Sequence, residues 1–211
     1  MLQAVIAGLL AGYAIAVPVG AIAVLIIQTG LSHGLRSGIA AAAGAASADL
    51  IYASTAALAG LWVASLIGPL IGPLRVVGGV ILIALGVRGL LALSSARESI
   101  NPMAAHDEAR RPHHRTYLTL LALTLLNPAT IVYFTALTVG LPFLGGPGER
   151  LAFAAAAGFA SLSWQLLLAI VGAALGRGGG HRVRYWSAVL GNGVIVVLGA
   201  LIALSAFTAS G

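Results

Sequence analysis

The sequence predicts an all-α integral membrane protein with six transmembrane helices, arranged as two inverted three-helix repeats with both termini outside. Composition, a series of apolar runs and an internal repeat predict this class. Of the 211 residues, 60% are hydrophobic and 8% are charged, and the mean hydropathy is +1.04. Such a chain is too apolar for the surface of a soluble domain. We therefore expect residues 1–211 to form a single transmembrane domain.

The apolar residues fall into runs that are long enough to cross a bilayer, since a span needs about 20 of them. The first run is longer than the core of a signal peptide and has no basic residue ahead of it, so we expect it to remain as a span. The six runs cover residues 1–35, 37–65, 76–93, 117–144, 151–176 and 185–209.

The arginines predict the orientation of these spans. With six spans, three arginine-bearing loops share one side, and only Arg75 and Arg150 lie in loops on the other. Because short positively charged loops stay in the cytoplasm, we expect a multi-pass protein of the cell inner (plasma) membrane, with these three loops inside and the N- and C-termini outside. The inner loops contain Arg36, then Arg97, Arg110, Arg111 and Arg115, then Arg177, Arg182 and Arg184.

The charge and the cysteine count exclude several function classes. The formal charge of +6 and the pI near 10.8 reflect this topology, and no basic stripe with interleaved aromatics indicates a nucleic-acid partner. The chain has no cysteine, which excludes disulfides, iron–sulfur clusters and thiol chemistry. No cofactor motif is present.

The two halves of the chain resemble each other. Residues 44–49 align with 158–163, and 78–86 align with 191–199; Pro18 and Pro128 stand at matching places. The sequence thus predicts repeat one at 1–95, a cytoplasmic linker at 94–116 and repeat two at 116–211. A repeat of three spans must insert in opposite orientations, which makes an inverted pair.

Polar and helix-breaking residues meet in one predicted layer. With a helix rise of about 1.5 Å per residue, Pro18, Asp49, Asn127 and Gln165 each lie roughly 15 to 17 Å from the cytoplasmic ends of their spans. This depth is the middle of a hydrocarbon core of about 30 Å. Interrupted helices at corresponding places in two repeats indicate a transporter's binding site. The candidate substrate or coupling-ion residues are Asp49, Pro18, Gly20, Asn127, Pro128, Gln165, Tyr52 and Tyr133.

Asp49 is the only acidic side chain inside any predicted span. A charge at the centre of a bilayer costs about 2.5 to 3.5 kcal/mol even on insertion scales. One hypothesis is a structural acid that is protonated or is hydrogen-bonded to Asn127 or Gln165. The other is a carboxylate that alternately binds a proton and the substrate's cationic group. Arg88 could pair with Asp49, but its place near the end of a span favours a side chain that reaches the interface.

The two prolines predict broken helices. Pro18 with Gly20 suits an unwound segment with exposed amides, and Asn127 with Pro128 suits the N-cap and first residue of a restarting helix. Such a terminus favours an anionic group. A simple proline kink is the alternative. Tyr52 and Tyr133 follow these positions closely and could line the same cavity or serve in packing.

Two further patterns have structural explanations. Residues 94–115 contain histidines and acids that could handle metal, although the lack of regular ligand spacing favours a flexible linker. Gly8-x3-Gly12 and Gly34-x3-Gly38 permit close helix contacts within the chain. They would also suit a homodimer but do not require one.

Several of these residues together resemble the LysE/RhtB family of amino-acid exporters. The resemblance rests on Pro18-Val19-Gly20, Gly34-x3-Gly38, Gly44, Asp49, Gly78-x7-Gly86 and Leu126-Asn127-Pro128, and it covers nearly the whole chain. Ala21 stands where many relatives have a second proline. The resemblance implies export of an amino acid or derivative across a bacterial inner membrane in exchange for protons. Sodium is the alternative coupling ion.

We therefore predict a secondary active exporter that uses Asp49 as its proton or substrate carboxylate. The alternative is a divalent metal-ion exporter, because the superfamily resemblance extends to cadmium and nickel exporters. An enzyme is disfavoured because we expect every histidine to lie in a loop and find no second acid in any predicted span. A channel would require a ring of repeated ligands. An inert structural protein would tolerate replacement of Asp49.

Overall fold

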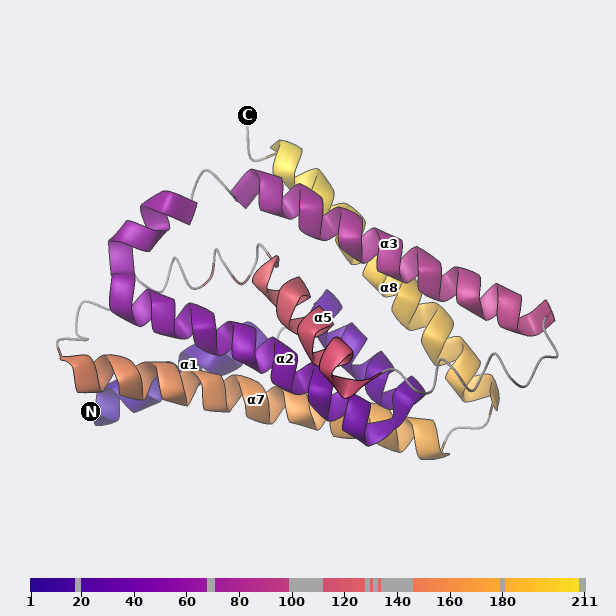
Figure 1. Ribbon diagram of the computed structural model, residues 1–211, viewed down its shortest axis with the longest axis horizontal. Helices are drawn as coiled ribbons and strands as arrows, with labels where there is room; N and C mark the ends of the chain where they lie inside the picture. The colour runs from indigo at the N-terminus through magenta and orange to yellow at the C-terminus, as the bar shows by residue number, and fades with distance from the viewer. Residues whose placement is uncertain are drawn as a thin grey trace.

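The described part of the computed structural model contains six α-helices and no strand, which confirms the predicted all-α class (Figure 1). The structure describes residues 1–17, 20–67, 71–98, 112–127, 130, 133, 146–178 and 181–208. The helices are α1 (Leu2–Ala16), α2 (Ala21–Ile67), α3 (Ile71–Glu98), α5 (His113–Leu125), α7 (Pro147–Gly178) and α8 (His181–Thr208).

Helix α2 consists of two antiparallel segments joined at Gly34. The φ angle of Gly34 is +79°, a conformation that glycine adopts without a steric penalty. A methyl group on Gly38 would lie 3.1 Å from the Gly30 Cα atom, whereas these residues would be about 12 Å apart in a straight helix. We call residues 21–33 the first segment of α2 and residues 38–67 its second segment.

Helix α1 and the first segment of α2 run along α7 in the same direction. Methyl groups placed on glycines of either side would meet backbone atoms of the other side in five pairs of residues. One pair is Gly30 with Ala169, and in the other four pairs the two residues are 145 positions apart in the sequence. Because the offset is the same before and after the interruption at residues 17–20, the two pieces advance along α7 as one broken span. These four pairs are Gly8 with Phe153, Gly12 with Ala157, Gly172 with Ile27, and Gly176 with Leu31.

The second segment of α2 returns along α7 in the opposite direction. Gly38 contacts Ala169, and Arg150 donates to the Leu58 carbonyl oxygen at 3.5 Å. Residues of this segment between Gly38 and Leu58 are predominantly small and buried. Small side chains let helix backbones approach closely, which is the usual basis of packing between membrane helices.

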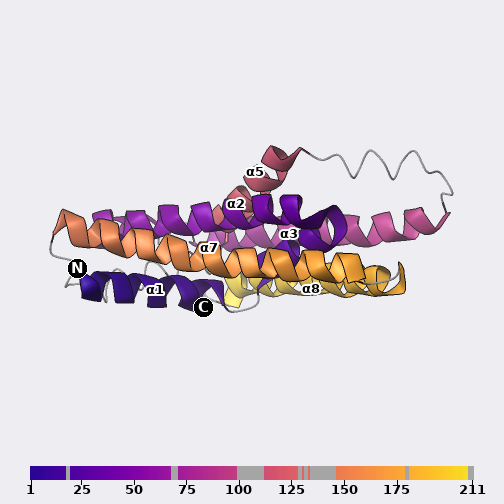
Figure 2. The same ribbon diagram turned by 90° about the horizontal axis from the view of Figure 1, so that it is seen from below.

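Helices α3 and α8 form a second antiparallel pair beside this group (Figure 1). Methyl groups on Gly79 and Gly199 would each meet the other's carbonyl oxygen, at 2.6 and 2.8 Å, and a methyl group on Gly86 would lie 2.8 Å from the Asn192 carbonyl oxygen. Helix α5 packs on α2, and Figure 2 shows α5 and α1 on opposite sides of the bundle.

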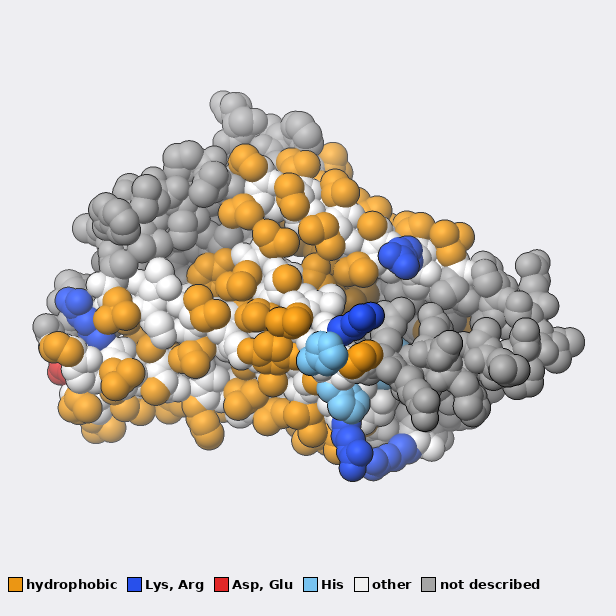
Figure 3. Space-filling view, in the orientation of Figure 1, with side chains coloured by type: hydrophobic (Ala, Val, Ile, Leu, Met, Phe, Trp, Pro, Cys, Tyr) orange, Lys and Arg blue, Asp and Glu red, His pale blue; other side chains and the backbone are white. Residues whose placement is uncertain are grey.

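The two ends of the bundle differ in charge. Ser37 and His113 share a hydrogen bond of 3.4 Å, and Leu31 contacts Gly176, so the turn after Gly34, the start of α5 and the end of α7 lie together. We call this the arginine end, because it carries Arg36, Arg115 and Arg177. Figure 3 shows basic and histidine side chains gathered there, with apolar side chains over much of the remaining face.

The opposite end holds the N-terminus. The Met1 ammonium group forms an ion pair of 3.2 Å with Glu149. By length and apolar composition, one helix of the described part, Pro147–Arg177, is able to cross a membrane alone. A second span is counted if Leu2–Ala16 and Ala21–Leu58, which meet at 76°, are taken as one. Two shorter apolar helices cover Val76–Leu91 and Ala188–Leu204.

Candidate functional site

Asp49 is buried between the second segment of α2 and α7. Its side chain is 4% exposed, and Ser161 Oγ of α7, which is fully buried, donates a hydrogen bond of 2.6 Å to Asp49 Oδ2. The partner is therefore Ser161, and not Asn127 or Gln165 as the sequence suggested. No basic side chain in the described ranges forms an ion pair with Asp49, and Arg88 is exposed. The Ser161 hydroxyl is thus the hydrogen-bond donor to this carboxyl group in the described part of the chain.

This contact lies near the middle of the bundle. At a rise of 1.5 Å per residue, Asp49 is about 16 Å along its segment from Gly38 at the arginine end and about 14 Å from Leu58 at the other end. The constant offset of 145 residues between the broken span and α7 gives Gly20 the same depth as Gln165. The interruption before Gly20 therefore lies at the depth of Asp49, Ser161 and Gln165.

Three buried polar atoms near this depth have no hydrogen-bond partner in the described structure: Gln165 Oε1, Trp164 Nε1 and Thr124 Oγ1. Gln165 is 5% exposed and follows Ser161 by one helical turn, so it lies on the same face of α7. Buried polar groups are nearly always paired in folded proteins. Each of these atoms therefore marks a position at which a ligand, a water or a second conformation would supply the missing partner.

Tyr52 connects the layer around Asp49 to the end of α5. It follows Asp49 by one turn of α2, and its hydroxyl donates to the Leu125 carbonyl oxygen. Leu125 is the last residue of α5, and the last carbonyls of a helix lack partners within it. Tyr52 thus satisfies a carbonyl group that the end of α5 exposes two residues before Asn127.

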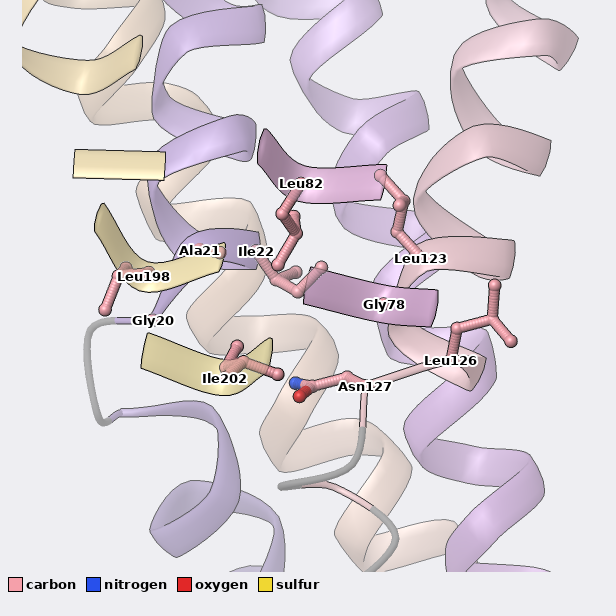
Figure 4. Close-up of a pocket in the computed structure, with 10 residues that line it drawn as sticks. All are labelled: Gly20, Ala21, Ile22, Gly78, Leu82, Leu123, Leu126, Asn127, Leu198 and Ile202. Atoms are coloured by element: carbon pink, nitrogen blue, oxygen red, sulfur yellow. The ribbon is translucent and has the colours of Figure 1, made fainter. Parts of the chain in front are cut away.

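A cavity of about 110 Å³ lies between the break before α2 and the end of α5, and α3 and α8 complete its wall (Figure 4). We call it the midplane cavity. Gly20 and Asn127 both line it, and Figure 4 shows the Asn127 amide pointing toward Ile202. The other side chains around it are apolar, including Ile22, Leu82 and Leu198. The cavity therefore combines one amide and an exposed backbone with an aliphatic wall.

The structure divides the residues predicted from the sequence into two groups. Asp49 and Gln165 lie at the α2–α7 interface, whereas Gly20 and Asn127 line the midplane cavity. Asp49 and Gln165 are not among the residues that line this cavity. The predicted residues thus lie at one depth but in two separate sites. The first segment of α2 lies between these sites, since it contacts α7 at Gly30 and lines the cavity at its start.

Other predicted residues have different outcomes. The helix interruption is confirmed, because α1 ends at Ala16 and α2 begins at Ala21. Pro18 and Pro128 themselves lie outside the described residues, as does most of the linker at 94–116. Tyr52 and Tyr133 pack against the same buried cluster that contains Phe153, and neither lines the midplane cavity.

Ser161 was missed as a site residue. The signal for it was the alignment of residues 44–49 with 158–163, since the helix that matches the one carrying Asp49 also carries a hydroxyl in the aligned stretch. In the described part of the chain, no group of three or more histidine, cysteine, aspartate or glutamate side chains could hold a metal ion.

A helical bundle with a broken span, a buried central acid and a cavity at the break has the architecture of a membrane transport protein. The family model for the LysE type translocator matches residues 13–206. The chain therefore belongs to this family. It is an efflux translocator of amino acids or related compounds and not an enzyme. No curated protein and no solved structure matches the sequence.

Proposed function

We propose that this protein is a secondary active exporter of an amino acid or amino-acid derivative, and that a proton bound at Asp49 drives it. The observation that carries this proposal is the buried Asp49 with its Ser161 contact, held at the depth of the break and the midplane cavity. An intramembrane acid is costly and is a candidate functional group by default.

The midplane cavity is the substrate site in this proposal. Amide and backbone groups at Asn127 and Gly20 suit the polar part of a zwitterion, and Ile22, Leu82 and Leu198 suit an aliphatic side chain. Ligand sites are typically apolar cavities with a few convergent polar groups. Because no acidic side chain is among the described residues that line the cavity, a neutral amino acid fits it better than one with a cationic side chain.

Asp49 serves mainly as the proton site in the conformation described. It is buried and bonded to Ser161, and it does not line the midplane cavity. Breaking that bond would allow the carboxyl group to turn toward the break at residues 17–20, which lies at the same depth. Gln165 Oε1, one turn of α7 beyond Ser161, has no hydrogen-bond partner in the described structure and offers the protonated carboxyl group an acceptor.

The broken span and Tyr52 would couple the proton site to the cavity. The first segment of α2 contacts α7 on one side and lines the cavity on the other, so a shift of this segment changes both. Tyr52 joins the helix of Asp49 to the residue two positions before Asn127. Sodium remains an alternative coupling ion.

The proposed membrane arrangement has six spans in two inverted repeats, 1–95 and 116–211. The antiparallel packing of α3 on α8, which lie at corresponding places in the two repeats, supports it, because inverted repeats run through the membrane in opposite directions. The grouping of Arg36, Arg115 and Arg177 at one end supports a cytoplasmic arginine end with both termini outside.

Efflux of preloaded labelled L-amino acids from cells at a fixed proton gradient tests the proposal. Cells with the wild type should export at least one amino acid, and Asp49→Asn at matched expression should fall to the level of cells without the protein. Glu149→Gln is the control, because it removes a carboxylate from the exposed ion pair with Met1 and should export like the wild type.

Full efflux by Asp49→Asn would overturn the proton role of this residue. If the wild type exports no amino acid, the proposed substrate class is wrong. The next measurement is then the tolerance of these cells to divalent cadmium or nickel. That metal-ion alternative has no support in the described ranges, since no candidate cluster of metal ligands occurs there.

A further inference from the structure

A second and larger cavity, of about 420 Å³, lies between α2, α3 and α5 at the arginine end. We call it the vestibule. It differs from the midplane cavity in polarity, because hydroxyl, imidazole and guanidinium groups line it. These polar residues are Thr29, His33, Arg115, Thr116 and Thr119.

The vestibule and the midplane cavity follow one another along the same three helices. On α2 the lining residues step from Ile22 to Leu25, and on α3 they step from Leu82 to Leu85. Steps of three residues stay on one face of a helix. Leu123 of α5 lines both cavities. One groove therefore leads from the arginine end to the break, with Leu123 between its two compartments.

The charge of the vestibule selects for anionic groups. No acidic side chain is among its lining residues in the described part of the chain, and Arg115 forms no ion pair there. A guanidinium group is the side chain best suited to bind a carboxylate, because it offers two parallel N–H donors. Threonine hydroxyls at positions 116 and 119 lie on the same wall, one and four residues beyond Arg115.

We propose that the vestibule receives the substrate from the arginine end, that Arg115 binds its carboxylate, and that the Leu123 side chain separates this first site from the midplane cavity. This inference rests on the proposed function for the nature of the substrate. The vestibule and its charge selectivity do not depend on transport, so they can be measured separately.

Because the chain contains no cysteine, a single introduced cysteine reports on the vestibule in the purified full-length protein. Thr119→Cys should react with anionic methanethiosulfonate ethylsulfonate faster than with the cationic trimethylammonium reagent, after correction for each reagent's rate with free thiol. Electrostatic attraction in a cleft raises encounter rates by about tenfold or more. Arg115→Gln in this background should remove most of that preference.

Arg36→Gln is the matched control, because Arg36 lies at the same end but does not line the vestibule. It should leave the preference unchanged. An equal effect of both arginine variants would show a general surface field, and an unchanged preference in Arg115→Gln would exclude its role; either result overturns the assignment.

The separating role of Leu123 is tested by a second reporter, Ile22→Cys, in the midplane cavity. Leu123→Ala should raise its rate of modification by neutral methyl methanethiosulfonate by several fold. Leu168→Ala is the control, since Leu168 is a buried leucine of the same core cluster on α7 and lines neither cavity. Equal acceleration by both variants would mean general loosening of the bundle, which contradicts a specific barrier.

The efflux assay then distinguishes the two proposals. If the protein exports an amino acid, Arg115→Gln should raise the KM for that amino acid with little change in the maximal rate. If no amino acid is exported but the cysteine reporter still prefers the anionic reagent through Arg115, the vestibule is anion-selective and the proposed cargo is wrong. Export without any dependence on Arg115 overturns only the inference about the vestibule.

Discussion

The two sides of α2 pack against their neighbours in different ways. Toward α7, glycines meet backbone carbonyls directly, as Gly172 does at Ile27 and Gly176 does at Leu31, and this interface holds Asp49. Toward α3 and α5, one glycine also meets a backbone carbonyl, Gly44 at Tyr117, but branched side chains such as Leu82 and Leu123 surround the midplane cavity and the vestibule. Backbone contact leaves no room for a ligand, whereas imperfectly filled leucine surfaces do.

This difference assigns distinct tasks to the two regions. A close-packed interface holds an acid and its hydroxyl partner in one geometry, which suits a site for a single proton. A loosely filled groove accommodates cargo and small movements of its walls. Two residues join the regions: Gly20 at the break, and Tyr52 of α2, which bonds to the end of α5. We expect proton binding and substrate binding to influence each other through them.

The largest expected effect separates the regions by function. Asp49→Asn should abolish proton-driven efflux but keep the thermal stabilisation that the exported amino acid gives the purified protein. Asn127→Leu should lose both, because a leucine places an apolar group where the amide faces the cavity. A ligand at 100 times its Kd stabilises a folded protein by about 2.7 kcal/mol. Loss of stabilisation in Asp49→Asn would mean that the acid contacts the substrate directly.

The second prediction concerns the close-packed side. Gly172→Ala should lower the free energy of unfolding by roughly 1 to 3 kcal/mol, the usual cost of overpacking, because the new methyl group would meet the Ile27 carbonyl oxygen. Gly193→Ala is the control, since no atom lies within 4 Å of its methyl position. Thermal unfolding in detergent measures both, and equal stability of the two variants would refute close backbone packing at Gly172.

The smallest effect is expected for the link between the regions. Tyr52→Phe removes the hydrogen bond to the Leu125 carbonyl oxygen and should cost about 1 kcal/mol of stability. It should also slow efflux several-fold, while the exported amino acid still stabilises the purified variant. This combination would identify Tyr52 as a positioning residue. Tyr13→Phe, which removes the exposed contact with Ser163, is the control. Equal efflux from both variants would show that the Tyr52 hydroxyl has no part in coupling.

The sequence by itself determined the class of the protein, the break in the first span and the identity of the buried acid. Each of these follows from local chemistry. Apolar runs predict spans because the bilayer excludes polar groups, proline and glycine at 18 and 20 interrupt a helix wherever it packs, and an isolated aspartate in an apolar run requires a partner. The resemblance to the LysE/RhtB family rests partly on the same proline, glycine and aspartate residues. The family model that matches residues 13–206 confirms it.

Only the tertiary structure decided which residues meet. The helices are apolar on all sides, so periodicity did not indicate which face turns inward. The partner of Asp49, the link from Tyr52 to Leu125 and the division of one layer into two places depend on how helices rotate and approach. Contacts between distant glycines and backbone carbonyls set those rotations, and such contacts have no signature in a single segment of sequence.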